Sequence, residues 1–178
     1  NATWLPNPVD STMFRPMPQD PHKEIRILHS STMPEIKGTK YLIESVDELR
    51  KKGYDIELKI VGVPPFGSTV PRTEMPKLLN WCDLVVNEIL LPVHSLVGIE
   101  AMLSEKPVLS SYKIDPKISD PPIFDISRET LTSDIRMAIE NLDEYKEKAK
   151  AGREWAIRNH DPEKVTDKLL ELYEEAMT

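Results

Sequence analysis

The chain has 178 residues, enough for one domain with a sizeable hydrophobic core. Its formal net charge of −7 argues against a broad nucleic-acid-binding surface, because such a surface needs clustered lysine and arginine. No apolar stretch approaches the roughly 20 residues of a membrane span, so no integral membrane segment is expected.

Strand-like and helix-like segments alternate along the first two thirds of the chain, and helical patterns follow from Ser127. Alternation with helices of this length implies parallel βαβ units. The predicted fold class is therefore α/β, a Rossmann-like doubly wound parallel sheet of about five or six strands followed by C-terminal helices. In chain order we expect strands at 25–29, 56–61, 84–86, 107–110 and, as the edge, 123–126, with helices at 39–52, 73–81 and 95–105 and a last helix after Asp161-Pro162.

The single cysteine, Cys82, lies in the apolar segment LLNWCDLVV and cannot form an internal disulfide. This context predicts a packed, unreactive thiol in a protein of a reducing compartment.

Ligands of open parallel sheets bind beyond the carboxyl ends of the strands, where the strand order reverses. Three segments follow predicted strands and are expected to meet there: 29–38, 63–69 and 87–95. The segment 113–122 is long and proline-rich, and we interpret it as a flap.

The run from Leu96 to Ser110, LVGIEAMLSEKPVLS, predicts a helix with an acidic residue near its start, a tight turn and a buried strand. Glu100 then lies near the positive end of a helix dipole, one to two turns from Ser95. A carboxylate there can accept hydrogen bonds from paired hydroxyls while free helix amides face an anion. That arrangement suits a ribose or another sugar beside a phosphate.

This run resembles the EAM-x-x-x-KPV signature of GT-B glycosyltransferases, the retaining group 1 enzymes that use nucleotide-diphosphate sugars. LPNPVDSTMFRP at the start resembles the linker into that family's C-terminal domain, IKGT at 36–39 its phosphate-side KG motif, and GREWAIRNHDPEKVTDKLLELYEE its closing helices. The resemblance implies half of a GT-B fold. Residues 1–20 would be the interdomain linker and an N-terminal extension, 21–160 the Rossmann-like nucleotide-sugar-binding domain, and 161–178 a C-terminal helix contacting an N-terminal domain.

The resemblance also implies roles for particular residues. Lys37 matches the lysine on the donor's phosphates and is the catalytic candidate, and Glu100 matches the glutamate that holds the nucleotide ribose. The remaining donor-binding candidates are Ser31, Gly38, Val63, Ser95, Leu96 and Val97. Structural interpretations stay open: Lys37 as a solvated lysine, Glu100 as an acid favoured by the helix dipole, and Ser95 as a simple helix cap.

The chain departs from the family pattern at three places. The arginine that usually precedes the lysine is replaced by the hydroxyl run Ser30, Ser31 and Thr32, and Ser95 replaces a glycine. Pro92 stands where the family's other acid is expected, although Glu88, four residues earlier, could compensate or could be structural.

The implied function is the binding of a nucleotide-diphosphate sugar donor for glycosyl transfer to an unknown acceptor, with this piece alone inactive. The expected partners are a nucleotide sugar, the acceptor and an N-terminal domain of the same polypeptide; no cofactor and no metal are expected. The expected location is the cytoplasm, with peripheral membrane attachment through the N-terminal domain as an option. The alternative is a non-catalytic sugar-nucleotide-binding or scaffold module.

Overall fold

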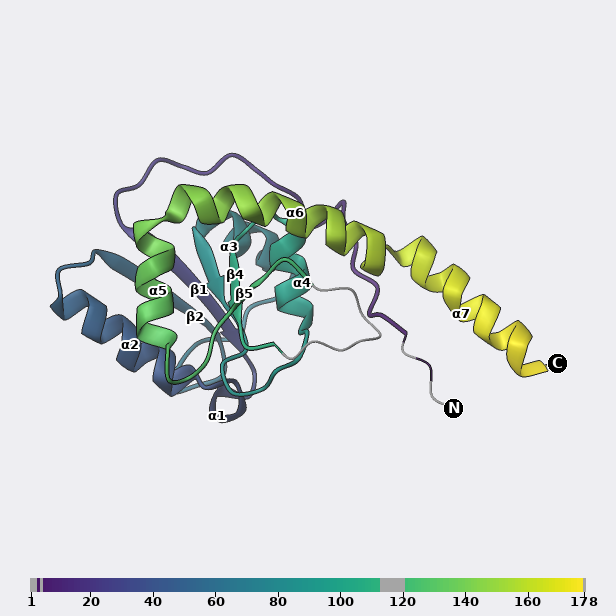
Figure 1. The fold of residues 1–178 in the computed structure, drawn as a ribbon, viewed down its shortest axis with the longest axis horizontal. Coiled ribbons are helices and arrows are strands. Elements are labelled where there is room, and N and C mark those ends of the chain that lie inside the picture. The colour runs from purple at the N-terminus through teal and green to yellow at the C-terminus, as the bar shows by residue number, and fades with distance from the viewer. Residues whose placement is uncertain (1–2, 4, 113–120, 178) are drawn as a thin grey trace.

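A computed structural model describes residue 3, residues 5–112 and residues 121–177 of the chain. Its centre is a five-stranded sheet in the order β2-β1-β3-β4-β5, and every neighbouring pair is parallel (Figure 1). The strands are β1 (Ile25–Ser31), β2 (Ile56–Gly62), β3 (Leu84–Val86), β4 (Val108–Ser110) and β5 (Phe124–Asp125).

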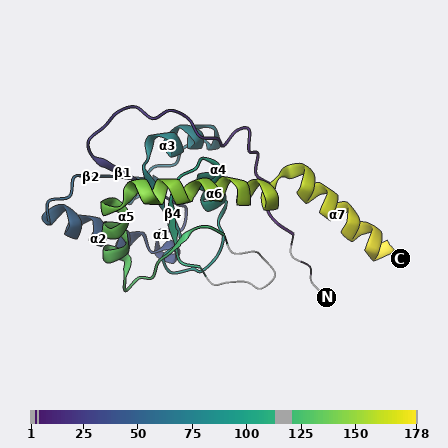
Figure 2. The ribbon, with the colours of Figure 1, turned by 45° about the horizontal axis from the view of Figure 1, so that its top comes forward.

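Helices cover both faces of this sheet, as the buried strand sequences require (Figures 1 and 2). Along β1, Leu28 packs with one hydrophobic cluster and Ile27 with the other, because successive side chains of a strand point to opposite faces. The helices are α1 (Pro34–Lys37), α2 (Thr39–Lys51), α3 (Met75–Trp81), α4 (Leu96–Leu103), α5 (Leu131–Glu140), α6 (Leu142–His160) and α7 (Pro162–Met177), with a 3-10 turn, η1 (Arg72–Glu74), before α3.

The two clusters belong to different helices. Residues of α2 and α5 form the core on one face, including Leu42, Val46 and Ile135. Residues of α3, α4 and α6 form the core on the other face, including Leu79 and Met102.

The N-terminal segment is tied to the body of the domain. The Val9 amide donates to the His160 carbonyl at 2.8 Å, and Arg153 of α6 donates to the Phe14 carbonyl at 3.1 Å. Phe14 itself is fully buried in the core of the α4 face. The opening residues therefore pack against α6 before the chain enters β1.

The last helix, α7, extends away from the body (Figures 1 and 2). Asp161 caps it, since its carboxylate accepts from the amides of Glu163 at 3.0 Å and Lys164 at 3.3 Å. Val165 is its one buried residue, whereas Tyr173 is 60% exposed. Contact of this helix with a further domain stays a prediction.

The predicted fold class is confirmed, including the parallel sheet and the edge strand near residue 124. Three local differences appear. The one-turn helix α1 was not predicted, the helix expected at 73–81 begins as the 3-10 turn η1, and the helix expected at 95–105 is the shorter α4. Cys82 is fully buried, and burial raises its pKa to about 12, as expected for an unreactive thiol. Most of the predicted flap lies outside the described residues.

Candidate functional site at the carboxyl edge of the sheet

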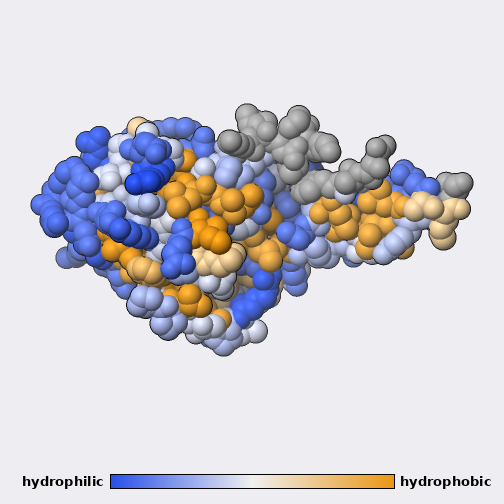
Figure 3. Space-filling model, turned by 90° about the horizontal axis from the view of Figure 1, so that it is seen from below, coloured by the Kyte–Doolittle hydropathy of each residue, from blue (hydrophilic) through white to orange (hydrophobic). Residues whose placement is uncertain are grey.

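The three segments expected to meet do follow the strands β1, β2 and β3, which end on the same edge of the sheet. Figure 3 views the face that carries α1 in Figure 1, and apolar side chains gather at its centre. Large apolar side chains that are more than a third exposed in these segments and at the start of α4 are Met33, Ile36, Leu90, Leu91, Val93 and Leu96.

Gly38 joins α1 to α2 in a conformation that requires glycine. Its φ is +82°, and a Cβ there would lie 3.0 Å from the Cβ of Ile89. The amide of Ile89 donates to the Lys37 carbonyl at 3.1 Å. Gly38 therefore makes room for the loop after β3, and its contact with a donor stays a prediction.

A buried histidine anchors the start of α2 to the sheet. His29 Nδ1 lies 2.8 Å from the Val86 carbonyl, which can only accept, so Nδ1 carries the proton and Thr39 Oγ1 donates to Nε2 at 2.8 Å. Burial lowers the pKa of His29 to about 4, and Lys37 acts in the same direction. This neutral anchor beneath Lys37 was missed in the sequence, because no spacing rule links residues 29, 39 and 86.

Ser95 caps α4 and is itself held by Asn87, directly after β3. Its Oγ accepts from the Gly98 amide at 3.4 Å and donates to Asn87 Oδ1 at 2.9 Å. The predicted capping is therefore confirmed. In the free chain Ser95, a predicted donor-binding residue, directs its single hydroxyl proton at Asn87.

Glu100 lies in the second turn of α4, and its side chain is only 2% exposed. Its Oε1 lies 2.7 Å from Nη2 of Arg72, whose side chain is 54% exposed. Burial raises the pKa of Glu100, and Arg72 offsets part of that rise. Arg72 was not among the predicted residues, although it is the one arginine between Val63 and Trp81.

Lys37 also has an acidic partner. Its Nζ lies 2.8 Å from Oε1 of Glu88 and donates to the Ser30 carbonyl at 3.1 Å. The two side chains are 12% and 3% exposed. The ammonium is therefore neither solvated, as one interpretation had it, nor an unbalanced positive charge.

Several polar atoms on this edge are buried without a hydrogen-bond partner among the described residues. They include Ser31 Oγ, Glu88 Oε2 and, beyond β3 and β4, His94 Nε2 and Tyr112 Oη. The rings of His94 and Tyr112 lie 4.5 Å apart, and His94 is half-buried although it lies in a loop. Burial lowers the pKa of His94 to about 4, and His160 adds to the effect.

The remaining predicted donor-binding residues follow β2 or begin α4. Val63 is half-buried directly after β2, Val97 is half-buried in the first turn of α4, and Leu96 beside it is 39% exposed. Across the described part of the chain, no three His, Cys, Asp or Glu side chains are grouped as a metal site requires. Over the same residues, no helix combines the length and the apolar character needed to cross a membrane.

Solved structures share this architecture. TarM of S. aureus, in a structure containing UDP, is 24% identical with a TM-score of 0.72 over 95% of this chain and 38% of that one. HepE of Anabaena, in complex with UDP-glucose, is 17% identical with a TM-score of 0.76 over 96% of this chain and 57% of that one. The C-terminal domain of LpcC, a glycosyl transferase group 1 family protein of Francisella tularensis, is 18% identical with a TM-score of 0.66 over 86% of this chain and 99% of the domain.

No protein-family profile and no curated protein sequence matches the chain. The chain spans 38% of the length of TarM and 57% of that of HepE, and it corresponds to nearly the whole LpcC domain. It therefore has the fold of the C-terminal half of GT-B glycosyltransferases.

Proposed function

We propose that the chain is the donor-binding domain of a glycosyltransferase, and that the carboxyl edge of its sheet holds a nucleotide-diphosphate sugar. The observation that carries this proposal is the carboxylate of Glu100, which is 2% exposed on α4 and paired with the half-exposed Arg72. A buried charge is costly unless it is compensated, and one cation at its rim compensates it only in part. Two ribose hydroxyls supply the missing donors as charge-assisted hydrogen bonds.

The first turn of α4 supports the phosphate end of the same ligand. Helix geometry leaves the amides of Leu96 and Val97 without intrahelical acceptors, and an anion is stabilised at such a terminus. Lys37 then belongs at the junction of the diphosphate and the sugar, and Val63 beside the base. Stabilising the leaving diphosphate by amides and one ammonium is a route to transfer that does not depend on a metal.

Transfer itself we assign to the cleft between this domain and an N-terminal domain, so we expect the 178-residue chain alone to bind donor without transferring it. A non-catalytic sugar-nucleotide-binding module is the second candidate, favoured by Pro92 at a position where a carboxylate would contact the sugar. Turnover by a full-length protein that contains this chain separates the two.

Nucleotide binding tests the proposal directly. Calorimetry and thermal shift with UDP, GDP and ADP should reveal a ligand, because a compound that binds only the native state stabilises it by mass action. Replacing Glu100 with Gln keeps its size and removes its charge, so affinity should fall about tenfold, roughly 1.4 kcal/mol. The matched control is Glu147→Gln, an exposed acid on α6. No heat and no thermal shift with any nucleotide at millimolar concentration would overturn the proposal, and unfolding of Glu100→Gln without a binding defect would make Glu100 structural.

A further inference from the structure

We propose that Glu88, held by Lys37, accepts a hydrogen bond from a hydroxyl group of the sugar that the donor carries, and so replaces the carboxylate that Pro92 cannot supply. This inference rests on the proposed function and assigns the sugar end of the ligand to a residue outside the expected spacing. Three observations support it: the backbone of Glu88 is fixed, its carboxylate has one oxygen without a partner, and the Lys37 ammonium has one donor to spare.

The backbone of Glu88 is fixed at the centre of the sheet edge. Its amide donates to Ser110 Oγ at 3.2 Å, and its carbonyl accepts from the Ser111 amide at 2.6 Å. Since Ser110 ends β4 and Glu88 follows β3, the side chain starts from two paired central strands rather than from a loose loop. A rigid origin of this kind is what a specificity residue needs.

The carboxylate of Glu88 uses only one of its oxygens. Oε1 lies 2.8 Å from Lys37 Nζ, whereas Oε2 is buried and has no hydrogen-bond partner among the described residues. Leaving a buried acceptor unsatisfied destabilises the free chain, and more so when the acceptor is charged. The free chain therefore keeps an acceptor that a bound ligand is expected to satisfy.

Lys37 has a hydrogen-bond donor to spare, which complements the spare acceptor of Glu88. An ammonium has three donors, and two of them point to Glu88 Oε1 and the Ser30 carbonyl. A third N–H beside a free carboxylate oxygen offers one donor and one acceptor together. A hydroxyl group matches both, because it donates its proton to Glu88 and accepts from Lys37.

A phosphate oxygen matches this pair poorly. It can accept from Lys37 but meets the negative charge of Glu88, which cancels most of the attraction at close range. The Glu88 side of the pair is therefore suited to sugar hydroxyls, and the diphosphate faces the N-terminus of α4, with Lys37 at its sugar end. Because Oε2 is covered in the free chain, a sugar reaches it by displacing covering side chains.

The test compares each nucleotide diphosphate with its sugar conjugate on the same chain. Calorimetry is done with UDP and UDP-glucose, GDP and GDP-mannose, and ADP and ADP-glucose. The wild-type chain should bind the matching conjugate at least about fivefold more tightly than the bare nucleotide, roughly 1 kcal/mol. In Glu88→Gln this preference should disappear while affinity for the bare nucleotide stays within about twofold, since the amide can still accept from Lys37 but not with a charged oxygen.

Controls separate the alternatives. Glu147→Gln, an exposed acid on α6, should retain the preference. If wild type binds nucleotide and conjugate equally, or if Glu88→Gln keeps the preference, Glu88 does not read the sugar; the wild-type arm decides this even where the variant fails to fold. A rise in affinity for bare UDP in Glu88→Gln without loss of preference would mean that Glu88 only competes for Lys37. If no nucleotide binds the wild-type chain, the proposed function fails first.

Discussion

The two ends of strand β3 each carry a buried acid, and the two acids are satisfied in opposite ways. Asp83 precedes the strand and is 2% exposed, with Oδ1 2.9 Å from Lys146 Nζ and Oδ2 2.8 Å from His22 Nε2. The Arg26 amide adds a third donor at 2.9 Å. Glu88 follows the strand and has one cation and one unpartnered oxygen among the described residues.

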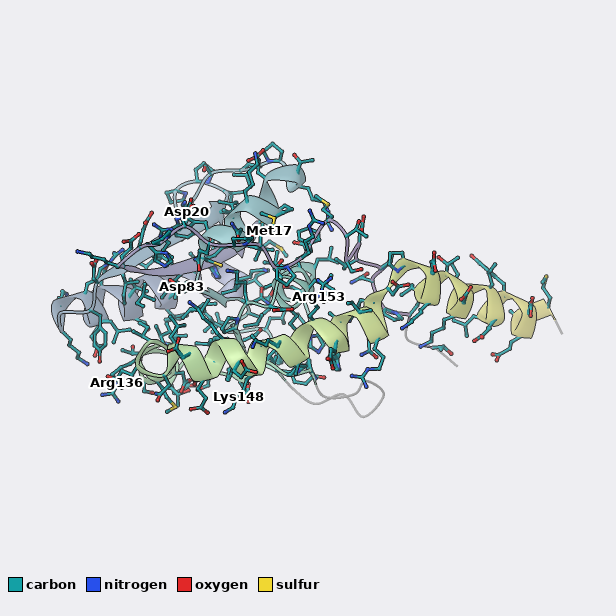
Figure 4. All side chains as sticks on the ribbon, turned by 90° about the horizontal axis from the view of Figure 1, so that it is seen from above. Met17, Asp20, Asp83, Arg136, Lys148 and Arg153 are labelled. Carbon is teal, nitrogen blue, oxygen red and sulfur yellow. The ribbon has the colours of Figure 1, made fainter. Side chains whose placement is uncertain are left out.

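This difference separates scaffold from site. At the amino end the chain itself supplies every donor to the Asp83 carboxylate, and these contacts tie the N-terminal segment and α6 to the sheet. Figure 4 shows Asp83 beside the segment that carries Asp20. A cavity of about 310 Å³ lies beside Asp83, yet its buried acid is fully paired. At the carboxyl end, buried polar atoms have no hydrogen-bond partner among the described residues. These unpartnered hydrogen-bonding groups, rather than the cavity beside Asp83, mark the proposed ligand site.

The largest expected effect on stability is that of Asp83→Ala, which removes the fully paired acid at the amino end of β3. Burial acts to raise the pKa of Asp83, but the Arg26 amide, Lys146 and His22 outweigh it and hold the pKa below its ordinary value, so the carboxylate is ionised in the native state. Removing one member of a buried charged cluster costs about 3 kcal/mol, which corresponds to a melting temperature lower by about 6–12 °C for a chain of this size.

Differential scanning calorimetry measures this loss, with Glu147→Ala on the surface of α6 as the control that should change little. Nucleotide affinity of the folded Asp83→Ala chain should match wild type, because Asp83 lies at the opposite end of the strand. If Asp83→Ala binds nucleotide more weakly than wild type while it is fully folded, the two ends of β3 do not act independently.

The fold could be predicted from the sequence because its signals are local and repeated. Apolar runs such as 84–86 have to be covered on both faces, and the helix stripe of Leu42, Val46 and Leu49 defines the covering face of α2. The short α1 was not predicted, because four residues are too few to show a helical periodicity. Its position depends on the contact of Gly38 with Ile89, which the sequence does not reveal.

The site could be predicted only where a motif fixes the spacing. Ser95 and Glu100 belong to one helix, so the sequence predicts that they lie one to two turns apart. Arg72, in contrast, contacts Glu100 although 28 positions separate them in the sequence. The pairing of Lys37 with Glu88 depends equally on how the loops after β1 and β3 pack. The partner of a buried charge is set by the three-dimensional packing. For this reason Lys37, Glu88 and Glu100 could be named singly from the sequence, whereas their pairing and Arg72 were missed.

Arg72→Ala tests the carboxyl end of the strand, because Arg72 is the cation that offsets part of the rise that burial causes in the pKa of Glu100. Without it the pKa of Glu100 should rise further, since burial is then unopposed. Nucleotide affinity should fall about threefold at pH 8, roughly 0.7 kcal/mol, and about tenfold at pH 5.5, where more of the carboxyl is protonated.

Calorimetric titrations with UDP across this pH range measure the effect, and Arg72→Lys should restore much of it. Arg15→Ala, an exposed arginine of the N-terminal segment, is the matched control. A loss of equal size at every pH would mean that Arg72 contacts the ligand itself rather than setting the charge of Glu100.

The smallest expected effect lies at the amino end, in His22→Gln. Both ring nitrogens of His22 face acceptors, Nδ1 the Asp20 carbonyl at 2.9 Å and Nε2 Asp83 Oδ2 at 2.8 Å, so the charged ring satisfies both. The Asp20 carbonyl and Asp83 raise the pKa of His22, and Arg26 opposes them. A raised native pKa contributes stability that is complete below the unfolded value, about 6.5, and is lost as the pH rises through the native value. Urea unfolding should therefore find the variant less stable than wild type by about 0.5–1 kcal/mol at pH 5.5, with the difference shrinking at pH 9. A difference that stays constant between these pH values would show that His22 is held as a neutral ring, and that the satisfied cluster around Asp83 relies on Lys146 for its positive charge.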